Sequence, residues 1–347
     1  MKKLFISIMA VAALVSCSKA DITYDEATEI SIAPVSGNIT KVMMTGTSFE
    51  TSQQFNVWAW YKQLAAGKTI SEWQAATDIT LQEYIKESPF KFRSSTNWGG
   101  VTPYYWPKQG SLLFAGYYPT SIATSVDYTF DASNNKMEFS NIEPTQVGST
   151  ADDYSEDIMY FNMTPSSVKE GPVAVEFKHA LSWITVNVAK TEDSPQIVID
   201  EIKFTGVYAS GNGVVDGANP IEWTCITKDA NNADVDPVEK VVATDVTLDE
   251  VTISDGKQVL TKLDVEPLFI PQNMLGNLYI KYTVYASETE KFTEEYNYVL
   301  SPSAPTTYNV WEPAKHYIYN IIIGTTEILI APEIDDWDDV ETGITIQ

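Results

Sequence analysis

Apolar and polar residues alternate one by one along many short segments of this chain, and this feature constrains the fold more than any other. Period-two alternation that is rich in β-branched and aromatic residues is typical of β-strands with one buried face. The pattern therefore predicts a chain made mostly of strands. The clearest runs are Phe55, Val57 and Ala59 against Asn56, Trp58 and Trp60, then Ile184, Val186 and Val188, then Val259, Leu263 and Val265, then Leu278, Ile280, Tyr282 and Val284.

Turn-forming clusters separate these runs and complete the prediction of fold class. Gly, Asn, Asp, Ser and Pro gather at residues 131–135, 211–219, 229–236 and 301–307. Helical signals are few, since only Ser71 and Gln74 have the spacing of a capping box, which predicts a short helix at 71–76. Strands and turns without β-helix-β alternation favour all-β sandwiches over a parallel sheet.

The first 17 residues predict where the chain is sent. Lys2 and Lys3 precede an apolar run at residues 4–15, which fits a secretory signal and is too short to span a bilayer. Ser16 before Cys17 is typical of a bacterial lipoprotein signal, in which the peptide 1–16 is removed and Cys17 is acylated, for example with palmitate. Ser18 in the next position favours the outer membrane. An ordinary secreted protein is the alternative.

Charge and cysteine content exclude several classes of protein. A net charge of −25 disfavours nucleic acid as a partner and disfavours a basic contact with a membrane surface. The chain has two cysteines, so lipidation of Cys17 leaves Cys225 without a disulfide partner. We expect Cys225 to be a buried apolar residue rather than a reactive thiol.

The motifs of catalysis and metal binding are missing from the sequence, and no catalytic residue, cofactor or metal is predicted. The two histidines, His179 and His316, are too few for a multi-histidine metal site, and we expect both to be packed or hydrogen-bonded. The acidic clusters at 152–157 and 335–339 lack EF-hand spacing and are expected to be solvated loops. A glycosidase with two paired carboxylates stays open, because 47 acidic residues always provide pairs.

Tryptophan supplies an alternative function. Trp58, Trp60, Trp98 and Trp106 could form a platform for sugars, which would make the chain a surface glycan-binding lipoprotein. Most tryptophans of a large all-β protein, however, lie in the core or between sheets.

The order and spacing of several segments resemble those of the fimbrillins of Bacteroidetes, which are lipoprotein precursors of type V pilus subunits and include an Mfa-like branch. No single segment is specific, and the resemblance runs nearly from end to end. Its pieces are the signal ending at Cys17, Ile30-Ser31-Ile32, Thr40-Lys41, Thr45-Gly46-Thr47-Ser48-Phe49, Phe55-Asn56-Val57-Trp58-Ala59-Trp60, Trp98, Tyr104-Tyr105-Trp106-Pro107, Leu112-Leu113-Phe114-Ala115-Gly116-Tyr117-Tyr118-Pro119, Asp157-Ile158-Met159, Val175-Glu176-Phe177-Lys178-His179-Ala180-Leu181-Ser182, Trp311, Tyr317-Ile318-Tyr319-Asn320-Ile321 and Ile334-Asp335-Asp336-Trp337.

The resemblance implies two transthyretin-like β-sandwich domains in tandem. With a joint near residues 168–178, we expect a signal peptide at 1–16, an acidic tether at 17–28, an N-terminal domain at 29–172 and a C-terminal domain at 173–347. It also implies a non-enzymatic structural or adhesive subunit of a fimbrium. Its partners would be the outer membrane through the lipid, other subunits in a homo- or hetero-polymer, and a host or bacterial surface receptor.

Assembly in this family is by donor-strand exchange, a form of β-augmentation. A protease removes the first strand of the precursor, and an extended C-terminal segment of the next subunit takes its place. Here the leaving strand would lie within 30–39. The donor candidates are 327–330 and 343–346, and the alternative is that these segments close the second sandwich.

Processing departs from the family pattern in one respect. The family protease usually cuts after an arginine, but the only arginine here is Arg93, well inside the first domain. The expected cleavage loop offers Lys41 instead. Either Lys41 is the processing site, or the first strand is retained and the lipidated chain serves as an anchor or a non-polymerising adhesin.

Overall fold

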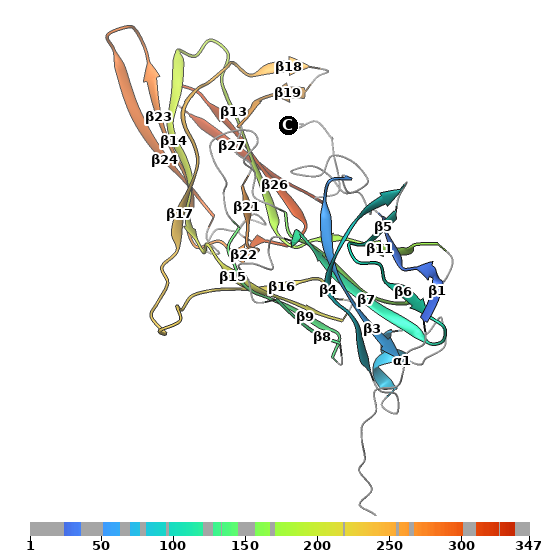
Figure 1. Cartoon of the computed structure of the whole chain (residues 1–347). Helices are drawn as coiled ribbons and strands as arrows, with labels where there is room; N and C mark the ends of the chain where they lie inside the picture. The colour runs from blue at the N-terminus through green and yellow to red at the C-terminus, as the bar shows by residue number, and fades with distance from the viewer. Residues whose placement is uncertain are drawn as a thin grey trace, which may run out of the picture.

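The structure is a computed structural model of the whole chain, and it is built almost entirely of β-strands (Figure 1). It describes residues 24–35, 51–62, 70–76, 81–94, 97–120, 128–132, 134–144, 157–166, 171–217, 219–254, 257–263, 267–300, 310–325 and 327–336. Within these ranges the single α-helix is α1 (Ile70–Ala75), close to the predicted short helix at 71–76. None of the described helical segments is long and apolar enough to cross a bilayer. The predicted all-β class is confirmed.

The N-terminal sheet has eight strands and curls so that β10 lies close to β11. Its strands run in the order β11 (Val173–Glu176), β2 (Ser31–Val35), β5 (Asn97–Gly100), β4 (Gln82–Ser94), β3 (Gln54–Lys62), β7 (Ser111–Tyr118), β10 (Met159–Ser166) and β12 (Lys178–His179). A separate pair, β1 (Tyr24–Glu29) and β6 (Tyr105–Pro107), lies beside it (Figure 1).

A bridging sheet joins the two halves of the chain. Its order is β16 (Glu222–Cys225), β15 (Gly211–Asp216), β9 (Lys136–Ile142) and β8 (Tyr128–Asp131). β15 and β16 follow the predicted joint near residues 168–178, whereas β8 and β9 precede it. Likewise β11 and β12 follow the predicted boundary between residues 172 and 173 but belong to the N-terminal sheet. Hydrogen bonding therefore crosses the predicted boundary, and the division into 29–172 and 173–347 stays a prediction.

Two further sheets face each other in the C-terminal half. The C-terminal mixed sheet contains β20 (Thr261–Lys262), β13 (Ser182–Lys190), β26 (Lys315–Ile323) and β27 (Ile328–Asp336), with β21 (Leu268–Phe269) also on β13. The C-terminal antiparallel sheet contains β17 (Val238–Thr247), β14 (Gln196–Val207), β23 (Asn277–Tyr285) and β24 (Lys291–Val299). Two small pairs are β18 (Thr252–Ser254) with β19 (Lys257–Val259), and β22 (Gln272–Asn273) with β25 (Val310–Trp311).

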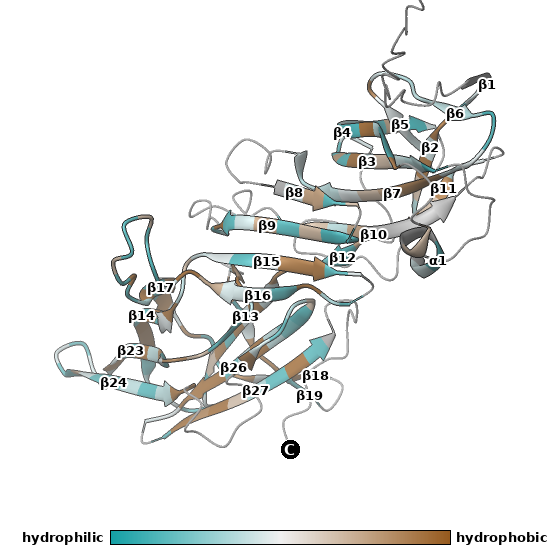
Figure 2. Cartoon of the chain, turned by 90° about the horizontal axis from the view of Figure 1, so that it is seen from below, coloured by the Kyte–Doolittle hydropathy of each residue, from teal (hydrophilic) through white to brown (hydrophobic). Residues whose placement is uncertain are grey.

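Three apolar cores follow from the alternation in the sequence. In β3, Phe55 and Val57 point into an N-terminal core inside the curled sheet, while Trp58 and Trp60 point into a middle core against the bridging sheet. The C-terminal core fills the space between the two C-terminal sheets. Central strands therefore bury both faces, and the hydropathy colouring shows apolar bands along β7, β13 and β26 (Figure 2).

Two sequence predictions about local structure are wrong. Residues 211–216 were expected in a turn but form β15, because the glycines make room for neighbouring side chains rather than for a turn. A Cβ on Gly213 would lie 2.8 Å from Ile221 Cδ1. The run at 259–266 is expected as one strand, but its described part, residues 259–263, is divided between β19 and β20, and Val259 is 46% exposed.

The prediction of an acidic tether at 17–28 is wrong for residues 24–28, which belong to a strand. Tyr24–Glu29 form β1 and pair with β6, in the register Tyr24 to Pro107 and Glu29 to Tyr105. The remaining residues of that segment, Cys17 among them, lie outside the described ranges.

Candidate strand-exchange site

Strand β2 lies inside the N-terminal sheet, where β11 flanks it on one side and β5 on the other. It pairs with β11 in parallel over four residues, from Ile32 opposite Val173 to Val35 opposite Glu176. With β5 it shares only two antiparallel pairs, at Ser31 and Ile32. Pro34 has no amide hydrogen to donate, which weakens a strand within a sheet. The strand is central in the sheet but has few pairings on one side.

Apolar side chains anchor β2 in the N-terminal core. Ile30 and Ile32 are fully buried, and Ala33 is nearly so. Val173 and Val175 of β11 and Trp98 of β5 belong to the same core and form the walls of the site. Each isoleucine contributes about 1.5 to 3 kcal/mol through burial. Removal of β2 would open an apolar groove between β5 and β11 that needs another strand with the same alternation.

Polar contacts fix the start of β2. The amide of Ile30 donates to the carbonyl of Tyr104 at 2.7 Å. One residue earlier, Glu29 Oε1 lies 3.9 Å from Arg93 Nη2, and Arg93 Nη2 also donates to the carbonyl of Gly100. The single arginine of the chain therefore links the first strands to β4 and β5.

The structure describes Arg93, but neither the predicted lipidation residue Cys17 nor the predicted processing residue Lys41. Arg93 lies in β4, which is paired with β3 on one side and β5 on the other, so a protease would meet it within a sheet. Cys17 and Lys41 lie outside the described residues, and their roles stay predictions. Val35, the last residue of β2, is six positions before Lys41 in the sequence.

The two donor candidates near the C-terminus also differ. Ile328, Leu329 and Ile330 begin β27, which pairs with β26 along its whole length and closes the C-terminal mixed sheet. For residues 327–330 the structure thus favours the alternative named above, closure of the second sandwich. Residues 343–346 lie outside the described ranges and remain the donor candidate.

The histidines occupy buried, hydrogen-bonded positions, as expected. His179 Nδ1 lies 2.6 Å from Asp157 Oδ2, and both side chains are 4% exposed. His316 Nε2 lies 2.8 Å from Thr185 Oγ1, and burial lowers the pKa of His316 to about 3, with a smaller contribution from Lys262. His316 is therefore neutral near pH 7.

The structure places Cys225 and the described residues of the two acidic clusters within the fold. Cys225 is a free, half-buried cysteine at the edge of the middle core, and burial raises the pKa of its thiol. Of the predicted acidic loops, Asp157 is buried beside His179, while Asp335 and Asp336 end β27. Among the described residues no group of three or more His, Cys, Asp and Glu side chains could hold a metal ion.

A sugar platform made of the four N-terminal tryptophans is contradicted by the structure. Trp58, Trp60, Trp98 and Trp106 are 5%, 7%, 2% and 1% exposed. They fill the N-terminal and middle cores, where Trp58 and Trp60 stack near Phe130. Burial of these large apolar rings stabilises the two cores, and buried rings are not available to bind a sugar.

The sequence did not reveal the wall of the site formed by β11. Residues 173–176 read as the first strand of a new domain, whereas they pair with β2, about 140 positions earlier. Local alternation identifies a strand but not its partner, so no signal in a single sequence shows this parallel pairing.

Comparison with known proteins adds the family context of this site. A family model described as fimbrillin-like matches residues 40–337. The chain matches none of the curated protein sequences with which it was compared.

Solved structures share the fold at low sequence identity. A fimbrial protein from Bacteroides vulgatus superposes with a TM-score of 0.58 at 15% identity, over 88% of this chain and 99% of that chain. A candidate cell adhesion protein from Bacteroides uniformis superposes with a TM-score of 0.52 at 14% identity, over 89% of this chain and 99% of that chain.

Proposed function

We propose, from the premise that this chain belongs to the fimbrillin-like family, that β2 is the strand exchanged when this pilus subunit joins its neighbour. The observation that carries the proposal is the position of β2 between β11 and β5, with Ile30 and Ile32 fully buried in the N-terminal core. When β2 leaves, the open edges and the apolar groove accept a strand from the next subunit.

The incoming strand must repeat the chemistry of β2. It needs apolar side chains at alternate positions for the N-terminal core and free backbone groups for β5 and β11. Ile344 and Ile346 have this spacing, like Ile30 and Ile32. Residues 343–346 of the next subunit are therefore our proposed donor.

The release step is proposed at Lys41. Cleavage there separates β2 from β3 and frees it from the folded domain, while the sheet keeps its remaining strands. If Lys41 is not cleaved, β2 stays in place and Cys17 holds the chain on the outer membrane, which suits an anchor or an adhesin. In both versions the role is structural or adhesive rather than enzymatic, and other subunits are the partners. The chain keeps its acylated Cys17 only where Lys41 is not cleaved, and an adhesin would have a surface receptor as a further partner.

The mass of the N-terminal peptide of protein isolated from its native outer membrane tests these versions. A chain that starts at Val42 in high-molecular-weight assemblies supports exchange after Lys41. A chain that starts at acylated Cys17 supports retention of β2. A non-acylated N-terminus that still contains β2 would contradict both versions.

A matched pair of variants separates processing from folding. Lys41→Gln removes the proposed cleavage site, and Lys19→Gln removes a lysine of the same N-terminal region. We expect Lys41→Gln to leave monomers that retain β2 and Lys19→Gln to assemble like the wild type. Normal assembly of Lys41→Gln would exclude Lys41 as the processing site.

A further inference from the structure

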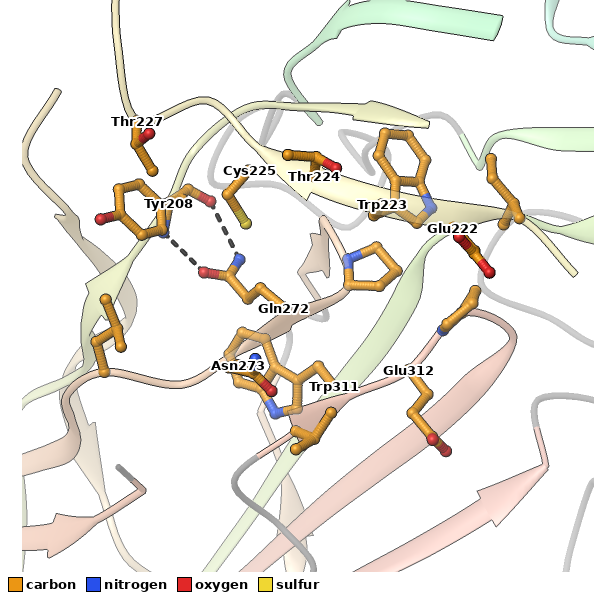
Figure 3. Close-up of a pocket in the computed structure, with 15 residues that line it drawn as sticks. Tyr208, Glu222, Trp223, Thr224, Cys225, Thr227, Gln272, Asn273, Trp311 and Glu312 are labelled. Carbon is orange, nitrogen blue, oxygen red and sulfur yellow. Dashed lines mark hydrogen bonds between the residues drawn. The ribbon is translucent and has the colours of Figure 1, made fainter. Parts of the chain in front are cut away.

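A pocket of about 640 Å³ lies between the bridging sheet and the small pair β22–β25 (Figure 3). β16 forms one wall, while β22 and β25 form the other. The pocket lies away from the β2 site, since it is lined by residues 208–313 rather than by the N-terminal sheet. Nothing in the exchange of β2 uses it.

The wall formed by β16 is the edge of a sheet. β16 pairs with β15 on one side only, with Thr224 opposite Asn212 and Trp223 opposite Gly213. The amide of Ile226 donates to the carbonyl of Ser210 at 2.9 Å, so alternate residues of this strand direct their amides toward β15. The backbone groups of Trp223 and Cys225 consequently point away from β15. Within the described ranges no strand pairs with this edge, which is a template for an added strand.

The opposite wall is held in one conformation. The side chain of Gln272 accepts a hydrogen bond from the amide of Tyr208 at 2.8 Å. It donates to the carbonyls of Tyr208 and Ile270 at 3.1 and 3.0 Å. Because these hydrogen bonds fix the side chain of Gln272, which Figure 3 draws beside Tyr208 and Cys225, the pocket is preformed and needs little reorganisation on binding.

The lining of the pocket contains both apolar and acidic side chains. Among the apolar lining residues, Leu275 and Val310 are 49% and 38% exposed. The carboxylates of Glu222 and Glu312 lie on the same side of the pocket in Figure 3, and both residues are exposed. The pocket therefore suits an extended segment with apolar side chains and one cationic side chain.

The hairpin β18–β19 offers such a segment. It forms a two-stranded sheet of its own, with Thr252 opposite Val259 and Ser254 opposite Lys257. Ile253 and Val259 are 66% and 46% exposed. The register places Val259 on the same face of the hairpin as Lys257, which supplies a cation, and Ile253 on the opposite face. A lone hairpin with exposed apolar residues is marginally stable in water, so it gains from a partner. Figure 1 shows it at the upper end of the C-terminal half, with β16 at the lower end.

We infer that the hairpin β18–β19 of one copy docks into the β16 pocket of a second copy. One hairpin strand extends the bridging sheet along the free edge of β16, and Lys257 faces Glu222 and Glu312. Because the two surfaces are different and lie at opposite ends, the contact is heterologous and builds an open row of subunits. This inference rests on the proposed subunit role but not on exchange of β2.

Photocrosslinking of the full chain tests the inference. p-Benzoylphenylalanine replaces Val259, and isotope-labelled and unlabelled copies are mixed so that crosslinks between copies are identified by mass spectrometry. We expect crosslinks between copies to map to β16, β22 or β25. The same photoreactive residue at Leu329, which is 47% exposed on β27, is the matched control and should give no such crosslinks.

Self-association provides a second readout. Val259→Asp places a charge in the apolar contact beside Lys257 and should weaken self-association in sedimentation by about tenfold or more. Leu275→Asp in the pocket should have the same effect, whereas Leu329→Asp should not. All three positions are exposed, so each variant should keep the wild-type melting temperature.

Charge exchange checks the orientation of the hairpin. Lys257→Glu should weaken the association, and Lys257→Glu combined with Glu312→Lys should restore it. Crosslinks no more frequent than the control, or crosslinks only within one copy, would overturn the inference. These experiments use protein that retains β2, so a negative result would not contradict exchange of β2. Likewise, a result that excludes Lys41 as the processing site would not contradict the contact between the hairpin and the pocket.

Discussion

The imidazole ring of His316 lies flat on the indole ring of Trp183, with ring centroids 3.5 Å apart and planes 5° from parallel. The two residues are register partners in the parallel pair β13–β26. Trp183 belongs to the middle core, while the next residue, Ile184, belongs to the C-terminal core. The stacked pair therefore lies where the two cores meet.

Acid should destabilise the protein through His316. Its pKa is about 3 in the folded chain and 6.5 in the unfolded chain, so only the unfolded chain takes up a proton as the pH falls through 6.5. The contribution of neutral His316 to the free energy of unfolding is complete above pH 6.5. Between pH 6.5 and pH 3 it decreases by at most about 1.4 kcal/mol per pH unit. Urea unfolding of wild type and His316→Gln between pH 7.5 and 5 should show a shallower dependence in the variant. Equal slopes would contradict this account.

Truncation of Ile32 should weaken the protein far more than truncation of its neighbour. Ile32→Ala removes fully buried atoms from the N-terminal core and should lower the free energy of unfolding by about 2 to 5 kcal/mol. Ser31→Ala, at the half-buried neighbouring position, should change it by about 0.5 kcal/mol. Chemical denaturation measures both, and equal losses would show that β2 is not anchored by its apolar face.

A methyl group at Gly116 should not be tolerated. The added Cβ would overlap the ring of Phe161 and lie 2.5 Å from the backbone carbonyl oxygen of Asn56. Since the carbonyl belongs to the adjacent strand β3, relief requires movement of the sheet, and Gly116→Ala should cost about 3 kcal/mol. Gly324→Ala is the control, because its nearest heavy atom would be 3.4 Å away. Similar melting temperatures for the two variants would refute the prediction.

Arg93 should matter through its hydrogen bond more than through its charge. The ion pair with Glu29 is long and partly exposed, so Glu29→Gln should cost less than about 1 kcal/mol. Arg93→Ala also leaves the carbonyl of buried Gly100 without its donor and should cost about 1 to 3 kcal/mol. Unfolding free energies of the two variants and the double variant provide the comparison. If Glu29→Gln and Arg93→Ala lowered the free energy of unfolding equally, the contribution of Arg93 would come from its ion pair rather than from its hydrogen bond.

Sequence patterns alone determined the class of this fold and many of its buried residues. Alternation at Phe55, Val57, Ile184 and Ile280 predicted strands whose apolar faces are indeed buried, because a strand's side chains point to opposite faces whatever its partners are. The short helix and the packed histidines were also foreseen. Order and spacing of segments along the chain pointed to the family that the match over residues 40–337 confirms.

Only the tertiary structure decided which strands pair and which faces stay open. The pairing of β2 with β11, the bridging sheet and the burial of the four tryptophans depend on contacts between segments far apart in the sequence. The glycines of β15 read as a turn because glycine permits both turns and close packing, and only the neighbouring side chains decide between them. Local alternation fixes that a strand forms, whereas long-range packing selects its neighbours and leaves the edge of β16 free.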